Sequence, residues 1–277
     1  MIQIITDSSS LYTPSEARQA GFESVPLCVS IGDSHERDLL LDMEEYYRKI
    51  EQGLLPTSSQ PPLGDVIEVF EAYAGSSIIN ISMADGLSGT YQTACGAREM
   101  VKNKDQITVF NSRTLCGPHR YMVTQAQKMK EDGCSFQEIL DWLERAARNT
   151  ESFLIPQDFS FLKRGGRLTP LAAATGIVLK LKPIMKLTED GTRLDKFGVK
   201  RTMISAAQSI IDYLREKELG SQHILYISHA NALEDAQKMK VLFEQAFPGL
   251  EVVILELSAV FVAQGGPRCV AIQYIKR

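Results

Sequence analysis

The sequence lacks the features that mark several large classes of protein. No apolar run approaches the ~20 residues of a membrane-spanning helix. The first apolar run, MIQIITDSSS, has neither the basic start nor the long apolar stretch of a signal peptide. The 30 Lys and Arg are scattered among 34 Asp and Glu, which argues against a nucleic-acid-binding surface. We therefore expect a cytoplasmic protein with no integral membrane segment and no nucleic-acid partner.

Cysteine and ligand motifs are also sparse. The five cysteines are irregularly spaced and form no CxxC pair, so neither a disulfide framework nor a zinc site is predicted. Cys116 and His119 stand three apart, but two ligands do not make a metal site. The chain has no G-x-x-x-x-G-K-[ST], G-x-G-x-x-G or H-E-x-x-H motif. We expect no metal and no cofactor.

Strand and helix patterns alternate in the first half of the 277 residues. Apolar runs at 2–6, 77–82 and 107–110 are each followed by a helix pattern. Thr13 with Glu16, and Ser135 with Glu138, have the spacing of capping boxes. Strands separated by helices predict an α/β domain with a mostly parallel sheet flanked by helices.

The second half has a different pattern. Residues 182–199 read as a hairpin that turns at Asp190-Gly191, followed by a long helix pattern, the strand HILYIS, a further helix and two closing strands. This order predicts an α+β domain with a largely antiparallel sheet. We place the domains at 1–155 and 156–277.

The segment GLSGTYQTA, residues 86–94, stands where a helix begins after a strand. Small residues there expose the free N–H groups of the first turn, and Ser88, Gly89 and Thr90 could hold an anion. Ser88 as a plain helix cap is the simpler alternative. A serine esterase or thioesterase is the enzymatic one, with Ser88 as nucleophile and His229 as base, although the last glycine of G-x-S-x-G is absent.

Three other places have anion-binding chemistry. The loop around Thr57 and Ser58 carries consecutive hydroxyls before two prolines, which hold a chain extended. Arg167 follows two glycines, and Arg201 precedes a long helix; both guanidiniums suit a carboxylate, and both could equally be solvated surface charges. Gln264 lies in AQGGPR, which by itself is a loop.

Six segments in order resemble the pattern of the DegV family over nearly the whole chain. They are SSQPP, LSGTYQTA, GGRL, KPIM, KRTMISAA and GGPR, and the strand end ITDSSS precedes them as in the family pattern. The resemblance implies a two-domain α/β fold that binds one long-chain fatty acid, with its carboxylate at the domain junction and its tail in an apolar tunnel. It also implies a carrier rather than an enzyme, and a fatty acid kinase as a partner of some members.

The resemblance further implies the ligand-binding residues. Ser58 matches the loop threonine of the family, Ser88 its LSGT serine, and Arg167 and Arg201 its arginines near the carboxylate. Gly89 and Thr90 belong to the LSGTYQTA segment, and Thr57 directly precedes SSQPP. Gln264 stands where many relatives have histidine, and it can donate a hydrogen bond but not carry a charge. No residue is predicted to be catalytic. A structural or regulatory binding module is the remaining alternative.

Overall fold

The computed structural model describes residues 1–174 and 181–277. Internal contacts divide the chain into two compact units. The N-terminal unit comprises residues 1–148 together with the short segment 258–260, and the C-terminal unit comprises 149–257 and 261–277.

A four-stranded parallel sheet forms the centre of the N-terminal unit. Its strand order is β2-β1-β6-β7, and every neighbouring pair is parallel. The strands are β1 (Ile2–Asp7), β2 (Glu23–Val25), β6 (Ser77–Ser82) and β7 (Ile107–Asn111). β1 and β6 read as nearly continuous apolar runs because helices cover both faces of the sheet.

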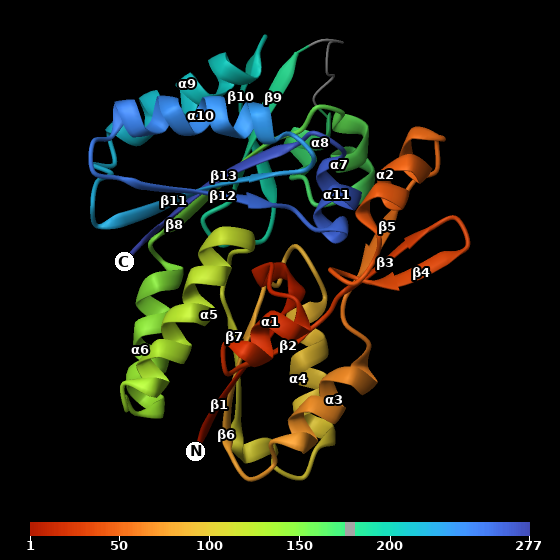
Figure 1. The fold of residues 1–277 in the computed structure, drawn as a ribbon, viewed down its shortest axis with the longest axis vertical. Coiled ribbons are helices and arrows are strands. Elements are labelled where there is room, and N and C mark those ends of the chain that lie inside the picture. The colour runs from red at the N-terminus through yellow and green to blue at the C-terminus, as the bar shows by residue number, and fades with distance from the viewer. Residues whose placement is uncertain (175–180) are drawn as a thin grey trace. The chain divides into compact units, whose positions relative to one another are not determined.

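Helices lie on the two faces of this sheet. In Figure 1, α3 and α4 lie on one side and α5 and α6 on the other. The helices of the unit are α1 (Pro14–Gln19), α2 (Met43–Glu51), α3 (Leu63–Ala72), α4 (Thr90–Met100), α5 (Cys116–Glu131) and α6 (Phe136–Ala147), with 3₁₀ turns at Ser8–Ser10 and Lys104–Gln106. Val66 and Phe70 of α3 pack with Ala94 and Ala97 of α4 in a core that also includes Ile78 of β6.

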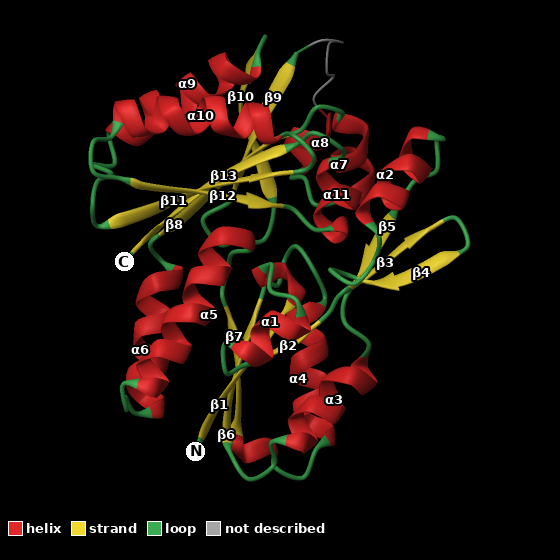
Figure 2. Ribbon diagram, in the orientation of Figure 1, coloured by secondary structure: helices red, strands yellow, loops and turns green. Residues whose placement is uncertain are grey.

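A small antiparallel sheet carries the hydroxyl loop. Its order is β4-β3-β5, with β3 (Cys28–Ile31), β4 (Ser34–Arg37) and β5 (Thr57–Ser59). Figure 2 shows these strands as a separate group next to α2. The apolar stretch 24–31 of the sequence is thus divided between two sheets, because β2 ends at Val25 and β3 begins at Cys28.

The C-terminal unit is built on a six-stranded sheet. Its order is β10-β9-β8-β13-β11-β12, and all neighbours are antiparallel except β11 and β12. The strands are β8 (Thr150–Ile155), β9 (Lys182–Leu187), β10 (Leu194–Lys200), β11 (His223–His229), β12 (Glu251–Glu256) and β13 (Val270–Lys276); the helices are α7 (Phe159–Gly165), α8 (Pro170–Ala174), α9 (Met203–Arg215), α10 (Leu233–Ala246) and α11 (Ala259–Gly265).

Helices α9 and α10 cover one face of this sheet side by side (Figure 1). Ile210 and Leu214 of α9 and Phe243 of α10 are completely buried against it, in one core with Leu225 and Ile272. The mixed α/β fold, with one parallel and one largely antiparallel sheet, confirms the predicted fold class.

Local sequence signals match the structure closely. Both predicted capping boxes form, at Thr13 with Glu16 and at Ser135 with Glu138. β9 and β10 pair as the predicted hairpin, and Gly191 in its turn has φ +73°. Within the described parts of the chain, every helix is too short or too polar to cross a membrane.

Candidate functional site

Helix α4 begins with a cluster of small polar groups. Gly89 occupies its N-cap position and has no side chain to shield the helix end. The Ser88 hydroxyl lies 2.8 Å from that of Thr90 and accepts a 3.3 Å hydrogen bond from the Thr90 backbone N–H. Ser88 is half-buried and Thr90 is buried. The structure therefore brings these three predicted residues together at the positive end of an eleven-residue helix, where an anion is favoured.

The hydroxyl loop reaches the same helix end. Thr57 and Ser58 pair with Ser30 and Val29 in the antiparallel ladder of β3 and β5, and Ser58 is half-buried while Thr57 is exposed. Beyond the strand, the Gln60 side-chain oxygen occupies the space that a Cβ on Gly89 would fill. Only glycine at position 89 allows this approach, so the two predicted segments meet through Gln60.

A groove of about 720 Å³ runs along this junction. It is lined by Cys28, Ser59, Gln60, Pro61, Pro62, Leu63, Gly89, Gln92, Thr93 and Gly96. The side-chain nitrogen of Gln92 donates to both carboxylate oxygens of Asp85, at 3.0 and 3.1 Å, which holds Gln92 in place. At the Cys28 end, Arg37 donates to the thiol at 2.8 Å and pairs with Asp65 at 2.9 Å. The groove is thus lined mainly by uncharged polar and apolar groups.

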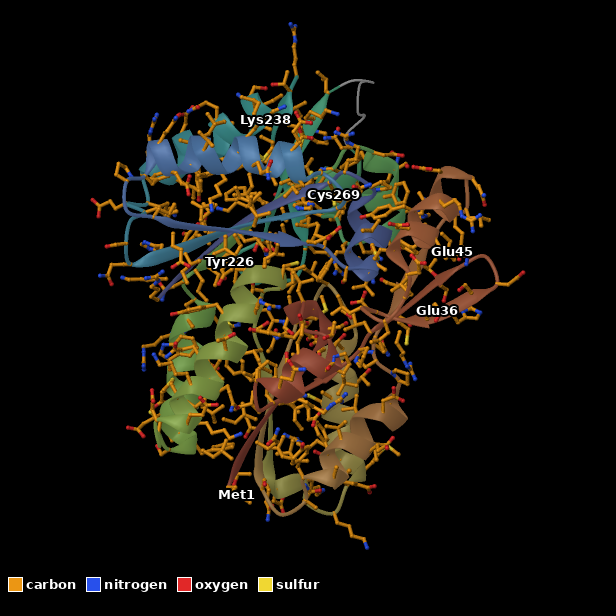
Figure 3. The ribbon with its side chains drawn as sticks, viewed as in Figure 1. Met1, Glu36, Glu45, Tyr226, Lys238 and Cys269 are labelled. Atoms are coloured by element: carbon orange, nitrogen blue, oxygen red, sulfur yellow. The ribbon has the colours of Figure 1, made fainter. Side chains whose placement is uncertain are left out.

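Arg167 and Gln264 meet at Gly165 in the C-terminal unit. The Arg167 guanidinium donates to the Gly165 carbonyl, and the Gln264 side-chain oxygen fills the position of a Cβ on Gly165. The adjacent Gly265, the last residue of α11, packs against the side chain of Cys269. Cys269 is labelled in Figure 3. Burial, and secondly the like charge of Arg193, lower the pKa of Arg167. The negative charge of a bound carboxylate would favour the charged guanidinium and so oppose both effects.

Arg201 belongs to the C-terminal unit and lies just before helix α9. It is exposed, two residues before α9, whose N-cap is Thr202 in a capping box with Ser205. This position agrees with the predicted head of a helix. It equally suits a solvated helix-end charge.

His229 lacks the setting of a triad base. Its Nδ1 accepts a hydrogen bond from the Ala232 backbone N–H at 3.3 Å, so the proton of the neutral ring lies on Nε2. A base that deprotonates serine needs a free Nε2 and an Nδ1–H held by a carboxylate. Burial lowers the pKa of His229, with the charge of Glu256 opposing it. This geometry argues against the esterase alternative.

A buried polar network lies beyond the end of β1, where the sequence pattern predicted only a turn or a strand end. Asp7 accepts from the backbone N–H groups of Ser9 and Met83, both at 2.9 Å. Ser9 lies 2.7 Å from Nδ1 of His119, and Ser8 donates to Asp38 at 2.8 Å. The three serines after β1 are completely buried. They hold loops of the N-terminal unit together, which the DSSS motif by itself could not reveal.

Asp38, which the sequence analysis did not single out, is completely buried. Burial raises the pKa of its carboxyl group to about 6, although Ser8, Ser258 and two backbone N–H groups donate to it. No signal in the sequence distinguishes it from the surface acids around it. Among residues 1–174 and 181–277, no group of three or more His, Cys, Asp or Glu side chains is placed to hold a metal ion.

Comparison with known proteins defines the class of this fold. A family model described as "Uncharacterised protein, DegV family" matches residues 1–277. A DegV domain-containing protein of Halalkalibacterium halodurans is 31% identical over 260 residues, which cover 91% of this chain and 90% of the relative. The chain belongs to the DegV family.

Two solved structures are similar over their whole length. A DegV family protein from Thermus thermophilus, described with fatty acid binding, has a TM-score of 0.89 at 26% identity, with 100% of this chain and 99% of the other covered. DegV of Bacillus subtilis, described as a fatty acid binding protein, has a TM-score of 0.86 at 28% identity and the same coverage.

Proposed function

We propose that this protein is a carrier that binds one long-chain fatty acid. The observation that carries the proposal is its likeness, over the full chain, to two DegV structures described as fatty acid binding. The chemistry of the two polar clusters supports it. One offers hydroxyls at a helix N-terminus, and the other offers a half-buried guanidinium beside a second cation.

We assign the carboxylate contacts to the residues of these clusters. In the N-terminal unit they are Ser58, Ser88 and Thr90, with Thr57 and Gly89 beside them. In the C-terminal unit they are Arg167 and Gln264, with Arg201 as a further cation. The acyl tail is proposed to lie in an apolar tunnel. Burying ~14 methylenes at ~0.8 kcal/mol each gives ~11 kcal/mol before association costs of ~4 kcal/mol or more, so the tail supplies the affinity and the carboxylate contacts fix its orientation.

Native mass spectrometry of the purified protein tests the proposal. We expect a mass increase of one fatty acid, identified after extraction, and displacement of that acid by stearate added in excess. Protein that is purified empty and binds none of a series of saturated and unsaturated acids would overturn the proposal. Turnover of an acyl ester that Ser88→Ala abolishes would instead support the esterase alternative.

Paired variants test the assigned contacts. Removing a hydrogen bond to a charged group removes about 1.5–3 kcal/mol, so Ser88→Ala and Arg167→Gln should each weaken binding by roughly tenfold or more. Ser15→Ala on α1 and Arg215→Gln on α9 change exposed residues outside both clusters and serve as matched controls. Equal affinity for all four variants would remove Ser88 and Arg167 from the site.

We propose further that the bound acid is presented to a fatty acid kinase. Gln264 bears on this step because an amide can hold a carboxylate but cannot relay a proton. The loaded protein, incubated with ATP and a kinase of this class, should yield acyl phosphate, and Gln264→His should yield it faster. Absence of acyl phosphate with both proteins would exclude the partnership.

A further inference from the structure

Helix α11 is anchored at its start by residues far away in the sequence. The Oδ1 atom of Asp38 accepts a hydrogen bond from the Val260 N–H at 3.3 Å, and Oδ2 accepts from the Ser258 hydroxyl at 2.9 Å. The Tyr46 hydroxyl donates to the Ala259 carbonyl at 3.0 Å. Asp38 and Tyr46 therefore hold the three residues 258–260, which belong to the N-terminal unit.

Asp38 takes the place of a local helix cap. Ser258 directly precedes α11 and is a residue type that commonly caps helices with its own oxygen. Here its hydroxyl donates to Asp38 instead, and the carboxylate of Asp38 accepts the N–H of the first turn. A carboxylate at this end also interacts favourably with the helix dipole.

This anchor uses a group that is costly to bury. Asp38 has no exposed surface, and no cation is among the groups that act on its titration. The titratable group facing it is the phenol of Tyr46 on α2, whose pKa is raised by burial and then by the charge of Asp38. An apolar residue would avoid the desolvation cost of a carboxylate, so a role in positioning is a better explanation for Asp38 than stability.

The residue that this anchor places is Gln264. It follows Val260 by four positions in the same helix, about one turn, or about 6 Å along the axis. At that point the Gln264 side chain lies against the backbone of Gly165. A shift at the start of so short a helix moves its last turn by a similar amount.

We propose that Asp38 is a positioning residue for fatty-acid binding, which fixes the start of α11 and thereby the placement of Gln264. This inference rests on the proposed function. Asp38 itself makes no contact with the ligand in this proposal. Asp38 affects binding through Gln264, so this effect can be separated from a general effect on folding.

Substitutions at Asp38 and Tyr46 distinguish the hydrogen bonds that hold the start of α11 from the negative charge of Asp38. Asp38→Ala removes the acceptor for Val260. Asp38→Asn keeps an oxygen for that N–H and offers its amide to the hydroxyls of Ser8 and Ser258, which can rotate to accept. Tyr46→Phe keeps the buried ring and removes only the bond to Ala259. Val66→Ala is the control, because it weakens the core of the same unit away from α11.

Stearate binding and backbone hydrogen exchange are measured on every variant. Asp38→Ala should bind roughly five- to tenfold more weakly, as expected for one lost hydrogen bond of about 1 kcal/mol or slightly more. Asp38→Asn should bind like the parent. Hydrogen exchange at residues 260–264 should become faster in Asp38→Ala and Tyr46→Phe. In Val66→Ala it should become faster only by the amount that the overall loss of stability explains.

A double-mutant cycle decides the mechanism. Gln264→Ala should weaken binding in the parent and have little further effect in Asp38→Ala, since both act through one side chain. Fully additive losses would overturn the inference, as would unchanged exchange at 260–264 in Asp38→Ala or Tyr46→Phe. If Asp38→Ala does not fold, the cycle of Tyr46→Phe with Gln264→Ala gives the same decision. A parent protein that binds no acid would refute the proposed function, while the exchange data would still show whether Asp38 holds α11.

Discussion

The side-chain oxygen of Gln60 occupies the space of the missing Cβ of Gly89. This contact joins the end of the hydroxyl loop to the first turn of α4 and forms one wall of the groove. It depends on the absence of a side chain at position 89 rather than on an unusual backbone, because Gly89 has φ −73°.

Gly89→Ala should therefore displace Gln60 while leaving the fold intact. Since Gln60 is exposed and its amide can rotate away, we expect a loss of stability below about 1 kcal/mol but a clear decrease in fatty-acid affinity. Gln60→Ala combined with Gly89→Ala should remove the remaining strain. Chemical denaturation and stearate titration measure the two effects.

Gly96→Ala in the same helix is the comparison for stability. No atom lies within 4 Å of a Cβ at this position, so alanine should stabilise α4 by roughly 0.5–1 kcal/mol through its higher helix propensity. An equal gain for Gly89→Ala would contradict the steric role of Gln60.

Asp38→Asn should change the pH dependence of stability. The pKa of Asp38 is 3.8 in an unfolded chain and about 6 in the folded protein. As the pH rises from about 4 to 6, the unfolded chain loses its proton first, so ionisation favours unfolding by an amount on the order of 3 kcal/mol above pH 6. The asparagine variant should escape this loss and be relatively more stable at pH 8 than at pH 4 in urea unfolding.

Asp190→Asn provides a control of opposite sign. Hydrogen bonds from Thr188 and Thr192 lower the pKa of Asp190, so its contribution to stability is present above its unfolded pKa and is lost in acid. A profile for Asp38→Asn that moves in the same direction as that of Asp190→Asn would show that folding lowers the pKa of the Asp38 carboxyl group rather than raising it.

His119 should contribute to unfolding in acid. Its Nε2 faces the Ile81 carbonyl at 3.1 Å, so this nitrogen carries the proton and Nδ1 accepts from Ser9 at 2.7 Å. Burial lowers the pKa of the ring, opposed by the charge of Asp7 and the bond to Ile81. Because the unfolded chain binds the proton more tightly, stability should fall as the pH decreases below about 6.5.

His119→Gln should weaken this acid sensitivity, at a cost of roughly 1–3 kcal/mol at pH 8 from the lost buried hydrogen bonds. His35→Gln, which replaces an exposed histidine of β4, is the control. Thermal unfolding at pH 5 and pH 8 compares the three proteins, and identical acid sensitivity for all of them would contradict a neutral buried His119.

Arg268 occupies a backbone position suited to glycine. Its φ is +60°, and its guanidinium pairs with Asp235 at 3.4 Å while remaining largely exposed. Glycine avoids the strain of about 1 kcal/mol that any other side chain meets there, and an exposed ion pair contributes about 0–1 kcal/mol. We expect Arg268→Gly to be more stable than Arg268→Ala by about 1 kcal/mol in denaturant titration. A less stable glycine variant would contradict this.

The parts of the fold that depend on neighbouring residues could be predicted from the sequence. Thr13 and Ser135 find their capping partners three residues away, and Gly191 forms its turn within a short hairpin. Their signals are local, so a single sequence contains them.

The placement of Asp38 and Gln60 could not be predicted in this way. Asp38 meets Ser8 and Ser258, which are 30 and 220 positions away, and Gln60 meets Gly89 in another element. Sequence spacing gives no distance across such separations. The resemblance to the DegV family identified the segments around Ser58, Ser88, Arg167 and Gln264, but not the residues that hold α11.

The assignment of residues 258–260 to the N-terminal unit means that this unit is not a continuous piece of the chain. A fragment ending at Arg148 would lack Ser258 and Val260 as donors to the buried Asp38, and Ala259 as the acceptor for Tyr46. It would therefore leave a buried carboxylate and a buried phenol short of partners. The two units are consequently not interchangeable modules, and recombination at residue 148 between distant relatives should succeed only when the segment containing 258–260 is exchanged with it.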